Sequence, residues 1–319
     1  MNNVTFEAIF NFGDSNSDTG GFYAAFPSQP SPNGLTYFGR PTAQALGLPF
    51  LSPYLQSIGS DYRHGVNFAT SASPALRPNT SLFVTGISPF YLAVQVNQMK
   101  AFKSRVEEFK SQEYLFSGNT NLPQPDILGK ALYTIYTGQW DIAHDVAYLE
   151  GIGTRPFEPQ IASEIVNAVK ELYSSGGRAF LVFNLAPVGC YAAVLTLFSH
   201  DESDIDPLGC MSSFNNAVRE YNSLYQNPTS QGLQQGITAC CGYGGGSYNF
   251  DPRVFCRIST EINGQRVTAT ACSDPQNYVS WDGIHLTENA NKIMAYAVLS
   301  GSYFDPHFSL NEYCDFNLF

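Results

Sequence analysis

Two short segments, near opposite ends of the 319-residue chain, hold the residue types needed for acyl transfer. The segment AIFNFGDSNSDTGG (8–21) places Ser15 in a turn directly after an apolar run. The segment WDGIHLTENAN (281–291) places Asp282 three residues before His285. In nucleophilic acyl transfer an imidazole deprotonates a hydroxyl, and a carboxylate orients the imidazole. The residue types therefore predict a catalytic Ser15, with His285 as the base and Asp282 as the orienting carboxylate.

Each of these residues also has an ordinary structural interpretation. The run Gly13-Asp14-Ser15-Asn16 is typical of a turn, so Ser15 is equally explained as a turn serine. His285 suits a helix start where its ring satisfies a backbone carbonyl, and Asp282 suits a helix N-cap. A short motif is only a hypothesis until its structural context is known. Local sequence alone leaves both interpretations open.

Alternating strand and helix patterns indicate how Ser15 would be positioned. FEAIFNF (6–12) predicts a buried strand that ends just before Ser15, and LYTIY (132–136) and AFLVFNL (179–185) predict two more strands. Between the last two, apolar residues recur at helical spacing, at Ile161, Ile165, Val169 and Leu172. A strand, a helix and a strand at this spacing form a parallel unit, which predicts an α/β/α fold of three layers. In such folds ligands bind beyond the carboxyl ends of the strands, where Ser15 lies.

Three further helices are expected from apolar periodicity. The first follows Pro89 and has Leu92, Val96, Met99, Val106 and Phe109 on one face. The second passes through Phe214, Val218 and Tyr221, and the third runs from about Thr287 to Leu299. We find no internal repeat and no linker, and we therefore predict one domain over residues 1–319.

The composition limits the class of protein. Apolar residues make up 44% of the chain and charged residues 13%, which favours a globular protein over a disordered or coiled-coil one. The net charge of −11 argues against nucleic acid or an anionic membrane as the main partner. No apolar run is long enough for a transmembrane segment. Phosphate-loop, dinucleotide and zinc-protease motifs are missing, so we expect neither a cofactor nor a metal.

Cysteine usage and two sequons indicate a secreted protein. No pair of cysteines has zinc-ligand spacing, so we expect disulfides formed in an oxidising compartment, with the pairing left open. The sequons predict glycosylation at Asn3 and Asn79, and any signal peptide is expected to have been removed before Val4. Because the number of cysteines is odd, at least one thiol is unpaired within the monomer. The seven lie in the C-terminal half, at Cys190, Cys210, Cys240, Cys241, Cys256, Cys272 and Cys314.

Several motifs together resemble those of one family. Besides FGDSNSDTG and WDGIH, the chain contains GVNFA (65–69), LYTIYTGQWDI (132–142), NLAPVGCY (184–191) and ACCGYGGGSYNF (239–250), in that order. In this respect it resembles the plant GDSL esterases and lipases of the SGNH hydrolase superfamily over nearly its whole length. The resemblance implies a flavodoxin-like α/β/α sandwich around a central parallel sheet. It also implies a secreted enzyme that cleaves small-molecule or lipid carboxylic esters through an acyl-enzyme on Ser15.

The oxyanion hole departs from the pattern of that family. The resemblance implies three donors. They are the nucleophile's own N–H, a glycine N–H in the second motif, here GVNFATSASPAL (65–76), and an asparagine amide in the third motif, here GQWD (138–141). Here the first is Ser15, Ala72 stands in place of the glycine, and Trp140 stands in place of the asparagine. Alanine keeps its N–H, so we expect little loss at Ala72 if its φ is negative. The third donor is the indole of Trp140, the amide of Gln139, or neither, in which case Trp140 is an apolar wall of the acyl pocket.

A further departure concerns the sheet, and the departures together leave more than one function open. The resemblance implies an additional strand between the helix ending near Leu224 and the segment 227–232, so the sheet is expected either to lack one strand or to fill that place differently. The leading function is hydrolysis of a carboxylic ester. The alternatives are transfer of the acyl group to an alcohol acceptor, and a catalytically impaired protein that uses the scaffold for binding or defence.

Overall fold

The computed structural model describes residues 6–26, 48–79, 86–111, 121–141, 158–215 and 233–299. The chain divides into two compact units. Unit 1 comprises Met1–Gln29, Asn33–Phe183 and Asn311–Phe319, and unit 2 comprises Pro30–Pro32 and Asn184–Leu310. Because the chain divides into two units, the single domain over residues 1–319 stays a prediction.

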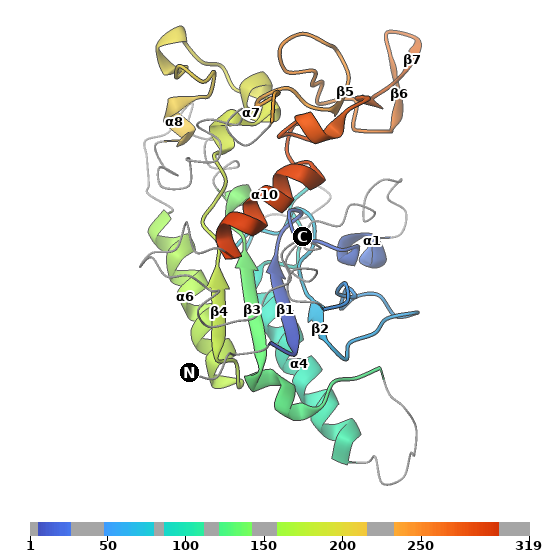
Figure 1. Ribbon diagram of the computed structural model, residues 1–319, viewed down its shortest axis with the longest axis vertical. Helices are drawn as coiled ribbons and strands as arrows, with labels where there is room; N and C mark the ends of the chain where they lie inside the picture. The colour runs from blue at the N-terminus through green and yellow to red at the C-terminus, as the bar shows by residue number, and fades with distance from the viewer. Residues whose placement is uncertain are drawn as a thin grey trace. The chain divides into compact units, whose positions relative to one another are not determined.

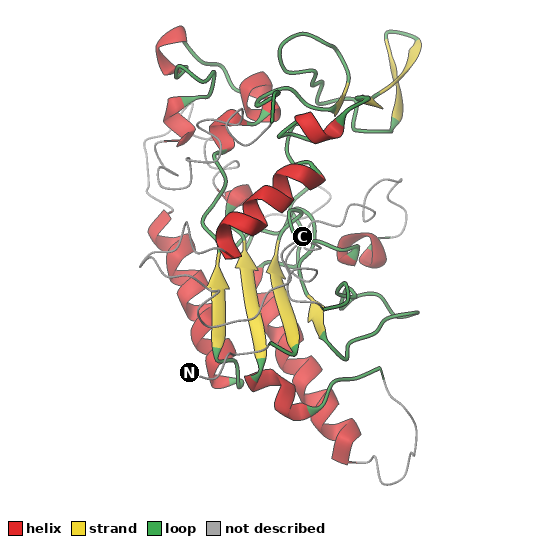
Figure 2. Cartoon of the chain, in the orientation of Figure 1, coloured by secondary structure: helices red, strands yellow, loops and turns green. Residues whose placement is uncertain are grey.

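Unit 1 is built on a parallel sheet of four strands in the order β2-β1-β3-β4 (Figures 1 and 2). The strands are β1 (Ala8–Gly13), β2 (Gly65–Asn67), β3 (Ala131–Tyr136) and β4 (Ala179–Val182). The register of β1 and β3 runs from Ala8 beside Ala131 to Gly13 beside Tyr136, so the two strands end together. The predicted strands and the parallel α/β architecture are confirmed. The segment from which a strand was expected to be missing lies in 216–232, outside the described residues.

Two helices cover one face of this sheet, as Figure 2 shows. They are α4 (Leu92–Ser111) and α6 (Glu158–Ser174). Alternate residues of β1 face them, and Phe10 contacts the rings of Phe102 on α4 and Tyr133 on β3. Burial of each such side chain contributes roughly 1.5–3 kcal/mol, which fixes α4 against the strands. Unit 1 also contains α1 (Gly21–Ala25) and the short 3-10 helix η2 (Pro125–Gly129).

The described residues of unit 2 have little regular structure besides the helix α10 (Glu288–Leu299), which confirms the helix predicted there. Its strands form two antiparallel pairs, β5 (Cys241–Gly242) with β8 (Thr270–Ala271) and β6 (Ser259–Ile262) with β7 (Gln265–Thr268). The short helices are η3 (Val188–Cys190), α7 (Ala192–Leu197), η4 (Glu202–Asp204), α8 (Ser212–Asn215) and η7 (Pro275–Asn277). The rest of the helix predicted through Tyr221 lies outside the described residues.

Three disulfides hold unit 2 together, which confirms that the cysteines pair. They join Cys190 to Cys210, Cys240 to Cys272, and Cys241 to Cys256, while Cys314 lies outside the described residues. Because Cys240 and Cys241 are adjacent, one short segment is tied covalently to two distant parts of the chain. Such cross-links compensate for a small apolar core, since closing a loop of about 15 residues contributes roughly 3 kcal/mol. Disulfides of this kind fit a protein of an oxidising compartment.

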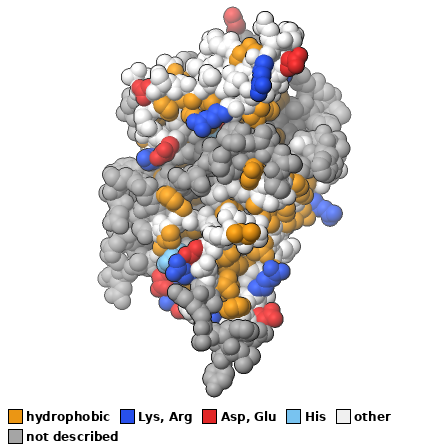
Figure 3. All heavy atoms as spheres, turned by 90° about the vertical axis from the view of Figure 1, so that its right-hand side faces the viewer, with side chains coloured by type: hydrophobic (Ala, Val, Ile, Leu, Met, Phe, Trp, Pro, Cys, Tyr) orange, Lys and Arg blue, Asp and Glu red, His pale blue; other side chains and the backbone are white. Residues whose placement is uncertain are grey.

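The described surface has few charged groups. On the face in Figure 3, the coloured Lys and Arg side chains are scattered and form no continuous basic patch. Within the part of the chain that the structure describes, no helix has the length and apolar character to cross a membrane. Among the same residues, no group of three or more His, Cys, Asp or Glu could hold a metal ion. Asn79 is exposed, as a glycan acceptor must be, whereas Asn3 lies outside the described residues.

Candidate active site

Ser15 lies in a tight turn that begins where β1 ends. Gly13 has φ +148°, and a Cβ placed on it would lie 2.0 Å from the carbonyl oxygen of Tyr136, so only glycine fits there. After Gly13, the N–H groups of Ser17 and Asp18 both donate to the carbonyl oxygen of Asp14, at 3.1 and 3.0 Å. The exposed fraction of Ser15 is 9%. The turn predicted from the sequence therefore exists, and it holds a nearly buried Ser15 at the carboxyl end of a central strand.

Gln95 of α4 fixes the last residue of β1. Its side chain is fully buried, and its Oε1 accepts from the N–H of Gly13 while its Nε2 donates to the carbonyl oxygen of the same residue, both at 2.8 Å. The Nε2 also donates to the carbonyl oxygen of Phe90. Gln95 was not predicted as a functional residue. The available signal was a lone amide on a helix face otherwise made of Leu92 and Met99.

A chain of buried amides supports the turn from the other side. The Thr134 hydroxyl donates to Asn11 Oδ1 at 2.7 Å, and Asn11 Nδ2 donates to Asn67 Oδ1 at 2.8 Å. Asn67 Nδ2 in turn donates to the carbonyl oxygen of Ser17 at 2.6 Å and to the Thr19 hydroxyl at 2.9 Å. The chain crosses β3, β1 and β2. Buried polar groups are costly when unpaired, so this network favours one position of the turn.

Asp18 connects the turn to the second motif. Its carboxylate accepts from the N–H groups of Gly20 and Gly21 and from both the N–H and the hydroxyl of Ser71. Burial raises the pKa of Asp18 above its ordinary value, although these hydrogen bonds act in the opposite direction. Ser71 is the residue immediately before Ala72, so Asp18 helps to place the backbone at the second predicted oxyanion donor.

Ala72 adopts a left-handed backbone with φ +60°, so the condition of a negative φ, under which little loss was expected, is not met. Its carbonyl oxygen accepts from the N–H of Ser88 at 2.8 Å, which holds the turn in this conformation. Residue 72 therefore has a backbone conformation that suits glycine, although the residue there is alanine. A non-glycine residue in this region costs about 1 kcal/mol or more.

We predict that Ala72→Gly leaves the free energy of unfolding unchanged or raises it by up to about 1 kcal/mol. Relief of backbone strain offsets the greater freedom that glycine has in the unfolded chain. The matched control is Ala101→Gly at an exposed position inside α4, which we expect to lose about 1 kcal/mol. Urea unfolding of both variants beside the wild type measures the difference. Equal losses in the two variants would contradict the strain assigned to Ala72.

The third motif starts a helical turn directly after β3 and is bonded to both other motifs. Gln139 Oε1 accepts from Asn16 Nδ2 at 3.0 Å, and Asn16 is the residue after Ser15. The carboxylate of Asp141 accepts from the N–H groups of Ala75 and Leu76 at 2.7 and 2.9 Å. Sequence analysis did not predict these contacts of Asp141. Within unit 1, the structure thus joins all three motifs around Ser15.

The pair of Asp282 and His285 is formed within unit 2. Asp282 Oδ2 lies 2.7 Å from His285 Nδ1, and Asp282 Oδ1 accepts from the N–H groups of Ile284 and His285 at 3.1 and 2.8 Å. The N–H of Trp281 donates to the carbonyl oxygen of His285, which closes the loop. Asp282 does not cap α10, because the hydroxyl of Thr287 accepts from the N–H of Ala290 at the start of that helix.

The electrostatics of the pair favour an ionised carboxylate. Burial by itself raises the pKa of Asp282, but the charge of His285 and the hydrogen bonds from His285 and Ile284 outweigh it, and the resulting pKa lies below the ordinary value of 3.8. At neutral pH, Asp282 is therefore an anion. A neutral imidazole that donates its Nδ1–H to this anion carries its basic lone pair on Nε2.

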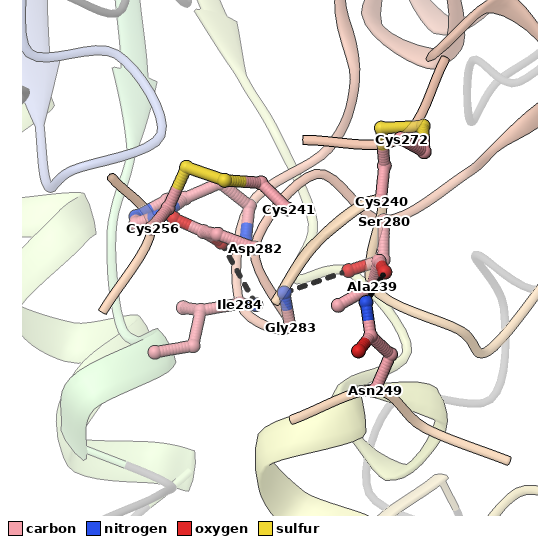
Figure 4. The surroundings of a disulfide bond; sticks show 11 residues. Ala239, Cys240, Cys241, Asn249, Cys256, Cys272, Ser280, Asp282, Gly283 and Ile284 are labelled. Carbon is pink, nitrogen blue, oxygen red and sulfur yellow. Dashed lines mark hydrogen bonds and ion pairs between the residues drawn. A yellow bond between two sulfur atoms is a disulfide. The ribbon is translucent and has the colours of Figure 1, made fainter. Parts of the chain in front are cut away.

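The disulfide segment supports the loop that carries this pair. The N–H groups of Cys240 and Cys241 donate to the carbonyl oxygens of Ser280 and Trp281, at 3.0 and 2.5 Å. Figure 4 shows the Cys241–Cys256 disulfide next to Asp282 and the Cys240–Cys272 disulfide next to Ser280. It also shows the Ser280 hydroxyl accepting from the N–H of Gly283. The sequence did not reveal this support, because it depends on which cysteines pair.

Gly283 is needed in the same loop for a steric reason. Its φ is +93°, and a Cβ there would lie 2.4 Å from a ring carbon of Phe250. Phe250 belongs to the motif ACCGYGGGSYNF, so that motif packs on the backbone between Asp282 and His285 as well as supplying the cysteines.

We predict that Cys241→Ala/Cys256→Ala lowers the free energy of unfolding by about 2–5 kcal/mol, because the unfolded chain regains the freedom of an open loop. We also expect a lower kcat, since Cys241 is bonded to the residue before Asp282. Chemical unfolding followed by circular dichroism gives the first quantity. Adding dithiothreitol is the control, and it should shift the wild-type midpoint more than that of the variant. Identical midpoints for variant and wild type would show that the disulfide contributes no stability.

Comparison with known proteins shows the family of the chain. The family described as GDSL-like Lipase/Acylhydrolase matches residues 9–298. The chain belongs to this family. It is 49% identical to a GDSL esterase/lipase of Arabidopsis thaliana, over 97% of this chain and 91% of that protein. It is 35% identical to alpha-L-fucosidase 3 of the same plant, over 91% of this chain and 89% of that protein.

A third relative, the GDSL esterase/lipase ACHE of Zea mays, is 34% identical over 97% of this chain and 89% of that protein. Family membership and the two relatives named GDSL esterase/lipase support carboxylic ester hydrolase activity for this GDSL protein. The residues matched by the family include Ser15, Asp282 and His285.

Proposed function

We propose that this GDSL protein is a secreted serine hydrolase, with one catalytic domain over residues 1–319, that cleaves small-molecule or lipid carboxylic esters through an acyl-enzyme on Ser15. The observation that carries the proposal is the bond of 2.7 Å between Asp282 and His285, in which the carboxylate has a lowered pKa. A carboxylate with a low pKa orients the imidazole and stabilises the cation that forms when the imidazole takes a proton. A solvated loop would not require such a pair.

The first half of the proposed reaction forms the acyl-enzyme. His285 Nε2 takes the proton of the Ser15 hydroxyl as Oγ attacks the ester carbonyl carbon, and the carbonyl oxygen becomes an oxyanion. The N–H groups of Ser15 and Ala72 are the first two donors to that oxyanion. When the tetrahedral intermediate collapses, the bond to the alkoxy group breaks, and His285 gives its proton to the departing alcohol.

The second half releases the acid. His285 takes a proton from water, the resulting hydroxide attacks the acyl carbon, and the bond to Ser15 Oγ breaks as His285 returns the proton to that oxygen. The pre-formed Asp282–His285 pair serves both halves, because the same imidazole acts as base and then as acid. The rigid support of the Ser15 turn by Gln95 lowers the entropic cost of bringing the nucleophile into position.

Secretion is part of the proposal. Three disulfides support it, as does the exposed position of Asn79 at one of the two sequons. We expect the protein made in a plant secretory pathway to lose mass on treatment with an N-glycosidase, at Asn3 and Asn79. An unchanged mass would remove glycosylation from the proposal and leave the catalytic part standing.

The test of the function is product analysis with p-nitrophenyl esters of increasing acyl length. We expect release of p-nitrophenol and free acid with short or medium acyl groups. Adding an alcohol acceptor separates hydrolysis from acyl transfer, because a transferase would yield a new ester in place of the acid. A p-nitrophenyl α-L-fucoside is included because one relative bears a fucosidase name. Turnover of the fucoside alone, or of no substrate by folded protein, would overturn the proposal.

A further inference from the structure

We propose that the indole N–H of Trp140 is the third donor of the oxyanion hole. This inference rests on the proposed ester hydrolysis and deepens it. The observation behind it concerns one atom. Trp140 Nε1 is shielded from solvent and has no hydrogen-bond partner among the residues that the structure describes.

A buried N–H without an acceptor needs an explanation. The great majority of buried polar groups in proteins are hydrogen-bonded, and leaving a donor unpaired costs about 1–3 kcal/mol. The interpretation of Trp140 as an apolar wall explains why its ring is half buried, but it does not explain a dry N–H that no acceptor meets. An acceptor that arrives only with the substrate does explain it. An oxyanion is the strongest such acceptor, because a hydrogen bond to a charged oxygen is roughly twice as strong as a neutral one.

The neighbours of Trp140 place it among the catalytic motifs. On one side, Gln139 is bonded to Asn16, the residue next to Ser15. On the other side, Asp141 holds the N–H groups of Ala75 and Leu76, in the motif that contains Ala72. The backbone of Trp140 is thus fixed from both directions, within unit 1, between the elements that carry the other two proposed donors. A donor on a rigid segment needs no reorganisation when charge develops.

The same contacts argue against the alternative donor. Gln139 Oε1 already accepts from Asn16 Nδ2, so turning the Gln139 amide towards an oxyanion would break a bond that holds the nucleophile turn. Trp140 can donate with every observed contact kept. Its indole nitrogen is a donor only, so it presents no lone pair to the oxyanion.

Three replacements at Trp140 separate a donor from a wall. Trp140→Phe keeps an aromatic wall and removes the N–H, and Trp140→Asn removes the wall and supplies an amide donor. Replacement by 3-benzothienylalanine keeps the shape of the indole and has sulfur in place of the N–H. We expect Phe and the sulfur isostere to lower kcat by roughly 10²–10³-fold with little change in KM, because the donor acts mainly on the transition state. We expect Trp140→Asn to retain more of the wild-type kcat than Trp140→Phe.

A trifluoromethyl ketone inhibitor supplies an independent readout. Its adduct with Ser15 carries an oxyanion, so its inhibition constant should weaken across the variants in proportion to the loss of kcat/KM. A wall would give the opposite order, with Phe and the sulfur isostere close to wild type and Asn strongly impaired. That order, in variants with wild-type thermal unfolding, would overturn the inference.

Failure of this inference is distinguishable from failure of the proposed function. If the wild type hydrolyses esters, Ser15→Ala does not, and the sulfur isostere keeps the wild-type kcat, only the role of Trp140 is overturned. If folded wild type neither hydrolyses esters nor reacts with the ketone, no oxyanion forms at Ser15, and both proposals are overturned.

Discussion

Replacing Ser15 by alanine should abolish ester turnover and leave the fold intact. We expect kcat to fall by on the order of 10⁶-fold, the loss known for removal of the nucleophile in a serine hydrolase, because no other group forms the acyl-enzyme. The substitution removes one oxygen from a nearly buried side chain in a turn that backbone and Asp14 contacts hold in place. The midpoint of thermal unfolding should therefore stay close to that of the wild type.

Ser17→Ala is the matched control. Ser17 lies in the same turn, two residues further on, and its buried hydroxyl makes no hydrogen bond among the described residues. Its backbone carbonyl, which Asn67 binds, is unchanged by the substitution. We expect a kcat close to wild type for Ser17→Ala. Turnover by Ser15→Ala above one hundredth of the wild-type rate, with purity confirmed by mass spectrometry, would exclude Ser15 as the nucleophile.

Asp282→Asn should lower kcat by on the order of 10⁴-fold, the loss seen when a triad carboxylate becomes an amide. Asparagine is nearly isosteric, and its Oδ1 can still accept from the N–H groups of Ile284 and His285. Its amide group, however, presents a donor to His285 Nδ1 where the carboxylate presented an acceptor. The imidazole then holds its proton on Nε2, and the ring cannot act as a base towards Ser15.

The same substitution should change the pH dependence of stability. The pKa of Asp282 is below 3.8 in the folded protein and close to 3.8 in the unfolded chain, so the folded state favours the anion. The stability that Asp282 contributes is complete above pH 3.8 and is lost as the pH falls through the folded pKa. We expect Asp282→Asn to be less stable than wild type at pH 7, and the difference to shrink below pH 3.8. Asp201→Asn, at an exposed position, is the control. A kcat of Asp282→Asn within tenfold of the wild-type kcat would contradict the role of Asp282.

Features set by neighbouring residues were predictable from the sequence. The strand before Ser15, the turn that contains it and the pair of Asp282 and His285 all depend on residues within a few positions of one another. Their spacing and apolar pattern therefore carry the information. The parallel sheet was predictable for the same reason, since the helix predicted between two strands supplies the crossover that parallel pairing needs.

Features that join distant residues were not predictable. Gln95 binds Gly13 across 82 positions, and Asn11 meets Asn67 across 56. An amide in a helix or strand pattern indicates a solvent-facing position until the fold shows that it is buried. The positive φ of Ala72 was missed because alanine gives no sign of it, whereas glycine would have done so. The cysteine count indicated disulfides but fixed no pairing.

The most direct test of the central claim is labelling with a fluorophosphonate, followed by peptide mapping. A fluorophosphonate reacts only with an activated serine, so it reports nucleophile and base together, whatever the natural ester. We predict one adduct per molecule, located on Ser15, which forms rapidly in the wild type and at least 10³-fold more slowly in His285→Ala, in line with the non-additive loss of a triad base. Folded wild type that stays unlabelled, or that carries its adduct on another serine, would contradict the account.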